Sequence, residues 1–229
     1  MNIAMLTCHD AGYSGLADIT VPNKIEYCKR WGYSFGCKTE GFAYPNVYSG
    51  KPSDLLIGFE KLHMVLETFE RNPELDWIHW TGADVIVTNM TVQLESIIDD
   101  TFSLIICADG NGLNVDSMLI KNDRMGKGLM QWILSKVETY RHSDWYEQRA
   151  LIDFYTQVPL ANHFIKVIPQ RVMNSYEYDL YPDWVNRPHL DTTGNDGDWK
   201  EGDFIFQVPG LPIQQRIDVI NRYAERVIR

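Results

Sequence analysis

The sequence has little positive charge. Its 21 lysines and arginines stand against 31 aspartates and glutamates, which gives the 229 residues a formal net charge of −10. Proteins that bind nucleic acid neutralise phosphates with clustered lysines and arginines, and an anionic membrane surface attracts the same side chains. The charge balance therefore argues against both kinds of partner.

Long apolar runs and the common nucleotide, metal and nucleophile motifs are lacking as well. No stretch approaches the ~20 apolar residues of a membrane-spanning helix, and the first eight residues are too few for the apolar part of a signal peptide. The four cysteines form no C-x-x-C pair, which favours reduced, mostly buried thiols in a cytoplasmic protein. Both glycine-rich nucleotide fingerprints are absent, and no spacing of serine or cysteine with histidine indicates a covalent nucleophile.

The sequence does have a regular alternation of strand and helix signals. Strands are predicted at residues 2–8, 33–39, 77–80, 85–87, 103–108, 116–120, 164–169 and 203–207, and helices at 22–30, 53–71, 94–98, 123–139, 145–155 and from 213 onward. Pro22 suits a first helical turn, and Ser53 suits a helix N-cap. The alternation predicts an α/β fold with a mostly parallel central sheet and helices on both faces, in one domain of residues 1–229.

Two segments are candidates for function. Residues 75–89 read L-D-W-I-H-W-T-G-A-D-V-I-V-T-N, so a buried strand delivers one carboxylate, Asp84, at its end. Such a carboxylate can bind a metal or cap a turn, and this segment alone does not separate the two. Residues 181–202 are rich in Pro, Gly, Asp and Trp. A loop of roughly 20 residues in a compact domain is typical of a lid or of an acceptor-binding loop.

Short motifs follow one another in a characteristic order along nearly the whole chain. They are Met5-Leu6-Thr7, Asn23 with Tyr27, residues 31–35, 59–61, 77–89, 109–114, 145–148, 169–174 and 202–204, and Pro209-Gly210. Together they resemble the retaining glycosyltransferases of family 34, which are galactosyl-, mannosyl- and xylosyltransferases with a GT-A fold. The chain is also similar to small virus-encoded capsid glycosyltransferases, which implies the host cytoplasm as its location if a virus encodes it.

The resemblance implies a donor site for a nucleotide sugar, most simply a UDP-sugar. Thr7 ends the first strand, where the family holds the base and ribose, and Gly210 belongs to the same donor site. Lys61 matches a basic position that faces the donor diphosphate, although a solvated helix lysine is the alternative. His9 follows the first strand and is a further donor-site candidate.

A metal site is implied by the same resemblance. Ala83 and Asp84 fall on the family's D-x-D motif, whose acids hold a divalent cation, Mn²⁺ or Mg²⁺, between the donor phosphates. The first acid of that motif is Gly82 here, and the family's late histidine ligand is Gln207. We therefore expect Asp84 and Gln207 to bind a divalent cation weakly.

Three residues are implied to face the transferred sugar. Gln148, which follows Glu147, matches the family's acid–glutamine pair beside the sugar, and Asn114 matches an asparagine that bonds sugar or acceptor hydroxyls. Asp116 replaces a glycine of the family, and it could bind the metal, orient the donor, act as a base or simply lie in a turn. An ordinary exposed helix position is the alternative for Gln148.

These positions predict an enzyme that moves a hexose or deoxyhexose from a nucleotide sugar to a hydroxyl of a glycan or glycoprotein. The resemblance implies retention, and inversion with Asp116 as the base is the alternative. Lys61, Asp116 and Gln148 are the predicted catalytic residues. Gly82 and Gln207 favour one alternative, a degenerate transferase that only binds nucleotide sugar or glycan. A phosphohydrolase with Asp84 as nucleophile is a second alternative.

Overall fold

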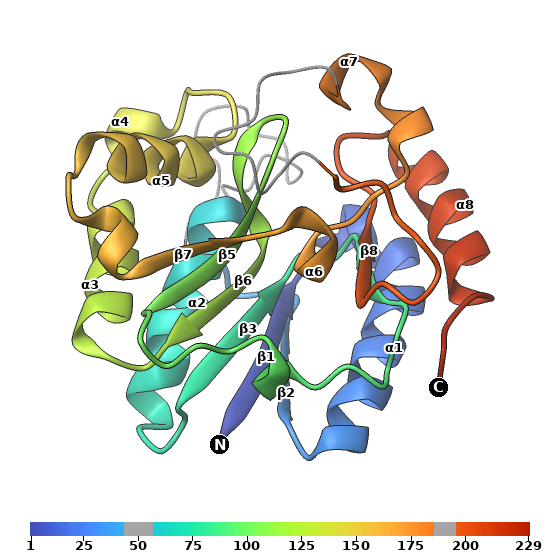
Figure 1. Cartoon of the computed structure of the whole chain (residues 1–229), viewed down its shortest axis with the longest axis horizontal. Helices are drawn as coiled ribbons and strands as arrows, with labels where there is room; N and C mark the ends of the chain where they lie inside the picture. The colour runs from blue at the N-terminus through green and yellow to red at the C-terminus, as the bar shows by residue number, and fades with distance from the viewer. Residues whose placement is uncertain (44–56, 186–195) are drawn as a thin grey trace.

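A six-stranded sheet forms the centre of the computed structural model, which describes residues 1–43, 57–185 and 196–229 (Figure 1). β1 pairs in parallel with β2 and β3, and β5 pairs in parallel with β7, whereas β6 is antiparallel to β3 and β5. The prediction of a mostly parallel sheet is confirmed, since β6 alone among these six strands runs against the others. In the order in which they lie in the sheet, the strands are β2 (Ser34–Lys38), β1 (Ile3–Cys8), β3 (Trp77–Thr81), β6 (Gly112–Lys121), β5 (Leu104–Asp109) and β7 (Ile165–Ile168).

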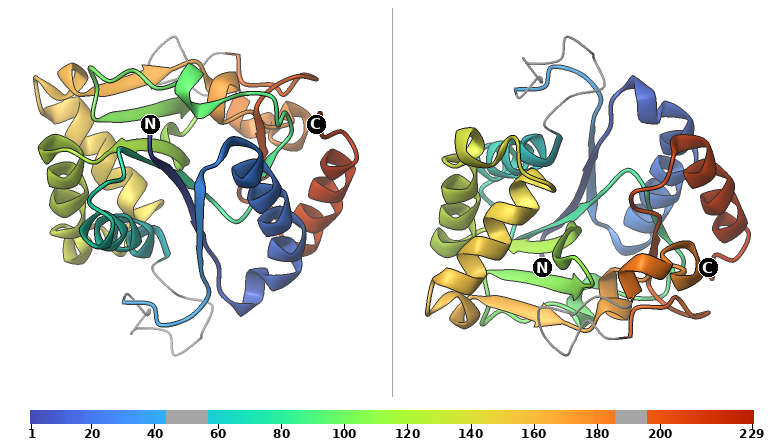
Figure 2. Two further views of the ribbon diagram at one scale, coloured as in Figure 1. Left: turned by 90° about the horizontal axis from the view of Figure 1, so that it is seen from below. Right: turned by 90° about the horizontal axis from the view of Figure 1, so that it is seen from above.

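Helices cover both faces of the sheet, as predicted (Figure 2). One face packs against α2, α3 and α5, with the short α4 beside α5, and the other packs against α1. A two-stranded antiparallel sheet of β4 and β8 lies on the α1 side, and α8 packs on α1. These elements are α1 (Ser14–Trp31), α2 (Ile57–Arg71), α3 (Arg124–Leu134), α4 (Val137–Tyr140), α5 (Tyr146–Gln157), α8 (Ile213–Ala224), β4 (Val85–Val87) and β8 (Ile205–Gln207).

Strand β3 is buried along its whole length. Ile78 and Trp80 pack into the core on the α2 side, while Trp77 packs into the core on the α1 side. Burying a large apolar side chain contributes roughly 1.5–3 kcal/mol, so both faces hold this strand firmly. The firmly packed strand therefore fixes the position of the turn that follows it, residues 82–84.

Helix α1 holds that turn through polar side chains. Thr20 Oγ1 donates to the carbonyl of Ala83 at 2.7 Å, and Lys24 Nζ donates to the carbonyl of Gly82 at 2.6 Å. Positions four apart lie on one face of a helix, so both donors reach the turn together. The turn thus depends on α1, although 58 or more residues separate the partners in sequence.

Helix α1 also shows where one boundary prediction was wrong. It begins at Ser14 instead of Pro22, which lies inside the helix. An interior proline removes one helical hydrogen bond and usually costs about 3 kcal/mol. Here Leu16 and Ala17, which precede the proline, are buried. Packing of the first turns therefore outweighs the helix-breaking effect of Pro22. The side chain of Asn23 stabilises the helix further, because it exchanges two hydrogen bonds with the backbone of β4.

Other boundaries differ less. The helix predicted at residues 123–139 is two helices, α3 and α4, because the chain breaks at Ser135 and Lys136, although Asp123 caps α3 by accepting from the Gly126 amide. The short helix predicted at 94–98 is one 3-10 turn, Leu94–Ser96. β6 starts at Gly112, earlier than predicted. The predicted cap Ser53 lies outside the described residues.

The predicted loop at residues 181–202 is described only in part. It begins with a short helix, α7 (Pro182–Val185), and residues 186–195 lie outside the described part of the chain. Its end is docked, since Trp199 is buried and packs edge-on against Phe206 and Tyr223. None of its described residues lines the cleft described below. The lid or acceptor role therefore stays a prediction for the middle of this segment.

Candidate functional site

A cleft with a volume of about 690 Å³ opens at the carboxyl ends of β1 and β3. Its walls come from the segment after β1, the turn after β3, the start of β6, the first turns of α2 and α5, and the segment from Pro209 to Arg216. Open α/β sheets bind ligands in the crevice beyond the carboxyl ends of their parallel strands. The cleft therefore lies where this fold is built to hold a small ligand.

The cleft brings together most of the residues singled out from the sequence. Thr7 and Gln207 are fully buried instead and do not line it. For Thr7 this differs from the predicted contact with a nucleotide, because the cleft opens one residue later, at Cys8. The predicted residues that line the cleft are His9, Lys61, Ala83, Asp84, Asn114, Asp116, Gln148 and Gly210.

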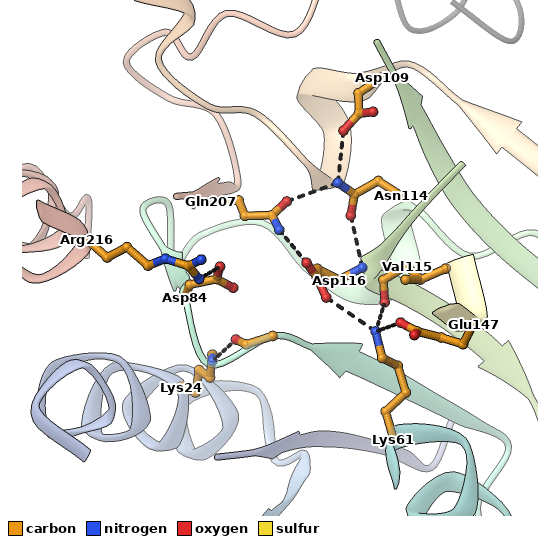
Figure 3. Close-up of polar contacts among 11 residues, drawn as sticks. Lys24, Lys61, Asp84, Asp109, Asn114, Val115, Asp116, Glu147, Gln207 and Arg216 are labelled. Carbon is orange, nitrogen blue, oxygen red and sulfur yellow. Dashed lines mark hydrogen bonds and ion pairs between the residues drawn. The ribbon is translucent and has the colours of Figure 1, made fainter. Parts of the chain in front are cut away.

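Lys61 is enclosed by oxygens. Its Nζ lies 2.9 Å from Glu147 Oε1, 3.3 Å from Asp116 Oδ1 and 3.2 Å from the carbonyl oxygen of Val115 (Figure 3). Burial by itself lowers the pKa of this amine, but Glu147 and Asp116 outweigh it and raise the pKa above its ordinary value. Because all three ammonium donors are used, the charge of Lys61 holds the two acids in place, and this ion pair is the reason the lysine can be buried.

A glycine makes room for this ion pair. An alanine Cβ at Gly58 would lie 1.7 Å from Glu147 Oε2, so the carboxylate occupies the space that any side chain there would fill. Glu147 and Gln148 are both buried in the first turn of α5, and both line the cleft. The close approach of α2 and α5 thus depends on the residue type at position 58.

Asp116 is the end of a chain of amide contacts (Figure 3). Its Oδ2 accepts from Gln207 Nε2 at 2.8 Å, while Gln207 Oε1 accepts from Asn114 Nδ2 at 3.3 Å. Asn114 Nδ2 also donates to Asp109 Oδ2 at 2.9 Å, and its Oδ1 accepts from the backbone amide of Asp116 at 2.9 Å. The backbone contact sets the orientation of the Asn114 amide, which in turn sets that of Gln207. The nitrogen of Gln207, not its oxygen, therefore faces Asp116.

Asp84 is paired with an arginine from α8. Arg216 Nη1 donates to Asp84 Oδ2 at 2.8 Å, and both side chains are largely buried. Burial raises the pKa of Asp84 from 3.8 to about 6, with Arg216 and the more distant Lys24 acting in the opposite direction. Burial likewise lowers the pKa of Lys24 to about 8. Asp84 and Arg216 thus form an ion pair that lines the cleft, whereas Lys24, which donates to the carbonyl of Gly82, does not line it.

The predicted metal ligands do not fit a divalent cation in this arrangement. Mn²⁺ and Mg²⁺ take about six oxygen ligands, of which carboxylates supply the charge. Asp84 already binds Arg216, Gly82 has no side chain, and Gln207 turns a nitrogen toward Asp116. In the described part of the chain, no three His, Cys, Asp or Glu side chains are grouped to hold a metal ion. The weak metal site expected from Asp84 and Gln207 is therefore not formed.

Sequence reasoning missed two charged residues at the turn after β3. Arg216 and Lys24 belong to none of the motifs, so no local signal marks them. Glu147 was expected beside the sugar as the acid of the acid–glutamine pair, but its ion pair with Lys61 was not expected, because it joins residues 86 positions apart that only the tertiary structure brings together.

The cleft at the carboxyl ends of the parallel strands, together with β6 running against its neighbours, matches the GT-A fold of solved glycosyltransferases. The chain belongs to the galactosyl transferase GMA12/MNN10 family, whose sequence model matches residues 2–104 and 99–215. The resemblance seen in the sequence motifs is thereby confirmed.

Curated relatives are distant. The chain is 22% identical over 197 residues to an α-1,2-galactosyltransferase of Schizosaccharomyces pombe, covering 71% of this chain and 51% of the relative. It is 25% identical over 192 residues to the probable α-1,6-mannosyltransferase MNN10 of Saccharomyces cerevisiae, covering 69% and 47%. The chain thus spans about half the length of these relatives.

Solved structures share the fold at lower identity. A glycosyltransferase involved in glycosylation of the major capsid of PBCV-1 superimposes with a TM-score of 0.70 at 16% identity, covering 97% of this chain and all of the other. The galactosyltransferase LgtC superimposes with a TM-score of 0.61 at 13% identity, covering 99% and 96%.

No helix in the described residues is long and apolar enough to cross a membrane.

Proposed function

We propose that this chain transfers a hexose or deoxyhexose from a nucleotide sugar, a UDP-sugar in the first instance, to a hydroxyl of a glycan or glycoprotein. One observation carries the proposal. Eight of the ten residues picked from the family motifs, which are spread from His9 to Gly210, line a single cleft in a chain of this family. Polar residues that are distant in sequence but gather in one cleft are typical of a ligand-binding site.

The chemistry of transfer needs positioning and charge more than a covalent intermediate. The bond from the sugar C1 to the diphosphate oxygen breaks, and its electron pair stays on that oxygen. The acceptor oxygen bonds to C1, and its proton ends on the departing diphosphate. We propose retention, the stereochemistry that the family resemblance implies. Asp116 lines the cleft, and each of its oxygens keeps a lone pair beyond its contact with Lys61 or Gln207, so this acid can accept a hydrogen bond from the sugar.

Gln148 is the proposed sugar contact, and Glu147 precedes it in the sequence. Both stand in the first turn of α5 and line the cleft. Glu147 is held by Lys61, which leaves the neighbouring amide of Gln148 as the group that can exchange hydrogen bonds with sugar hydroxyls.

Trp145 and Tyr146 form the proposed acceptor wall. Both line the cleft, and their side chains are 44% and 39% exposed. Exposed aromatic rings bury apolar sugar faces at little entropic cost. We expect Trp145→Ala to raise the KM for the acceptor about tenfold and to leave the KM for the donor unchanged, in initial-rate kinetics with either substrate varied. An equal rise in both KM values would contradict an acceptor role for this ring.

Nucleotide release with a panel of donors tests the function. The protein is incubated with UDP- and GDP-sugars, with and without simple glycoside acceptors, and nucleoside diphosphate and product are measured by NMR, which also gives the anomeric configuration. We expect one donor to be consumed with a retained product, and Gln148→Ala to lower kcat strongly. Gln131→Ala, at an exposed position of α3, is the matched control.

The same experiment separates the alternatives. Tight nucleotide binding without any release, whatever acceptor is supplied, would replace the enzyme by a binding module. Cleavage of generic phosphate esters that Asp84→Asn abolishes would indicate a phosphohydrolase. An inverted product would refute retention while leaving the transfer itself intact.

A further inference from the structure

Arg216 places a positive charge at the floor of the cleft. Arg216 is fixed there by three contacts: its Nη1 donates to Asp84 at 2.8 Å, its Nε donates to the carbonyl of Leu211 at 2.6 Å, and its guanidinium lies 5.4 Å from the ring centre of Tyr13. Its side chain is 13% exposed and lines the cleft (Figure 3).

The guanidinium keeps donors for a ligand. An arginine has five N–H donors, and in the described residues two of them are used, one on Leu211 and one on Asp84. The others are available in a planar fork, the geometry that matches phosphate oxygens. Arg216 therefore has both the charge and the free donors that a diphosphate requires.

The surroundings favour this cation over a metal ion. Lys24 lies behind the turn, bonded to the carbonyl of Gly82, and adds a second buried positive charge. The one acid beside Arg216 is Asp84, and the amide nitrogen of Gln207 faces the next acid, Asp116. A divalent cation would compete with Arg216 for Asp84, and Asp116, the other carboxylate near this turn, is already bonded to Lys61 and Gln207, whereas an anion meets preformed donors.

We propose that Arg216 takes the place of a divalent cation in this chain, so that its guanidinium binds the donor diphosphate and stabilises the charge on the departing nucleoside diphosphate without a metal. The inference rests on the proposed function, because it assumes that the cleft holds a nucleotide sugar. Charge stabilisation of a leaving group by fixed donors in a largely buried site is a major catalytic term. Arg216 is thereby a catalytic residue, and Asp84 is the group that positions it.

Binding of UDP and of GDP to the full chain, measured by calorimetry in EDTA and again in excess Mn²⁺, tests this role without relying on turnover. We expect equal affinity in the two buffers. Arg216→Gln should weaken binding about ten- to hundred-fold, since a charge-assisted contact is lost. Arg222→Gln is the matched control, because Arg222 lies on the same helix in an exposed pair with Glu177 and should leave affinity unchanged.

Asp84→Asn gives the sharpest contrast. If Arg216 is the cation, removing the neighbouring negative charge should raise nucleotide affinity about threefold to tenfold in EDTA. If Asp84 is a metal ligand, the same change should abolish binding. The double variant Asp84→Asn/Arg216→Gln removes both charges, so it tests the loss of Arg216 without leaving a buried acid unpaired, and a thermal melt confirms that it folds.

Each outcome decides the proposal. Binding that requires Mn²⁺, or wild-type affinity of Arg216→Gln in EDTA, overturns the role of Arg216 and leaves the glycosyltransferase function standing. Absence of UDP and GDP binding in both buffers overturns the proposed function and this inference with it. Equal affinity in the two buffers, combined with a selective loss in Arg216→Gln, supports it.

Discussion

The ion pair of Lys61 and Glu147 provides the most direct test of how the cleft wall is held. The change is Lys61→Met, which keeps the length of the side chain and removes its charge. Glu147, whose side chain is 8% exposed, and Asp116, whose side chain is 36% exposed, then lose their shared cation. The methionine cannot donate to Val115, so its carbonyl also loses a partner.

The magnitude follows from burial. At 2.9 Å and an effective dielectric constant of about 20, the gross attraction between the two charges is roughly 6 kcal/mol, against which desolvation of both groups must be set. Breaking a buried pair by removing one partner costs about 3–5 kcal/mol, because the remaining charge is left without compensation. For a chain of this length that corresponds to a fall in Tm of about 6–20 °C.

A second lysine supplies the matched control. Lys166 and Asp99 form a pair of similar length, 2.7 Å, but about a third of each side chain is exposed. Exposed pairs contribute little, so Lys166→Met should leave Tm nearly unchanged. Both variants are compared by calorimetric melting at neutral pH.

The double variant Lys61→Met/Glu147→Met completes the test. It removes both charges of the pair, so it should recover much of the stability lost in Lys61→Met. Equal Tm shifts for Lys61→Met and Lys166→Met would refute the reasoning, and so would a double variant no more stable than the single one. The first result would mean that Lys61 is solvated in the folded protein, and the second that the unpaired charge of Glu147 is not the source of the lost stability.

Two further predictions concern a close contact and a buried base. Gly58→Ala should lower Tm by several degrees, because its Cβ would lie 1.7 Å from the Glu147 carboxylate, whereas Gly128→Ala, with no atom within 4 Å, should not lower it. Burial lowers the pKa of His79 from 6.5 to about 3, so the unfolded chain takes up a proton on this residue that the folded chain does not as pH falls from 6.5 toward 3. Stability should be lost over that window by at most about 1.4 kcal/mol per pH unit, and His79→Phe should make the urea-unfolding free energy less steep there; an unchanged slope would contradict this.

Most strands and helices of the fold could be predicted from the sequence, because their apolar residues follow local patterns. β3 reads as a continuous apolar run because both of its faces are buried, and the helices at α2 and α8 keep a helical spacing of apolar residues. Such local patterns mark an element whatever its partners are. They failed at α1, where the inward side chains include Thr20, Asn23 and Lys24, which bond the backbone of a distant turn and strand instead of forming an apolar stripe.

The sequence led to residues that the structure brings to one cleft, but it did not indicate how those residues are bonded there. Ordered motifs marked Asp84, Asp116 and Gln148, because the order of motifs survives in a sequence even when identity is low. Gly82 and Gln207 also signalled from the sequence that a metal site was altered. The pairing of Asp84 with Arg216 could not be predicted from the sequence, because Arg216 lies 132 residues from Asp84 and belongs to no motif.

An α/β protein with a carboxylate at the end of a buried strand could be predicted from local properties of the chain, namely strand burial and the order of motifs. The contacts of that carboxylate depend on how distant segments pack. The packing of α8 against α1 places an arginine on Asp84, and the approach of α5 to α2 places an acid on Lys61. Both ion pairs join segments far apart in sequence, and the energy of a charge depends on what surrounds it after folding.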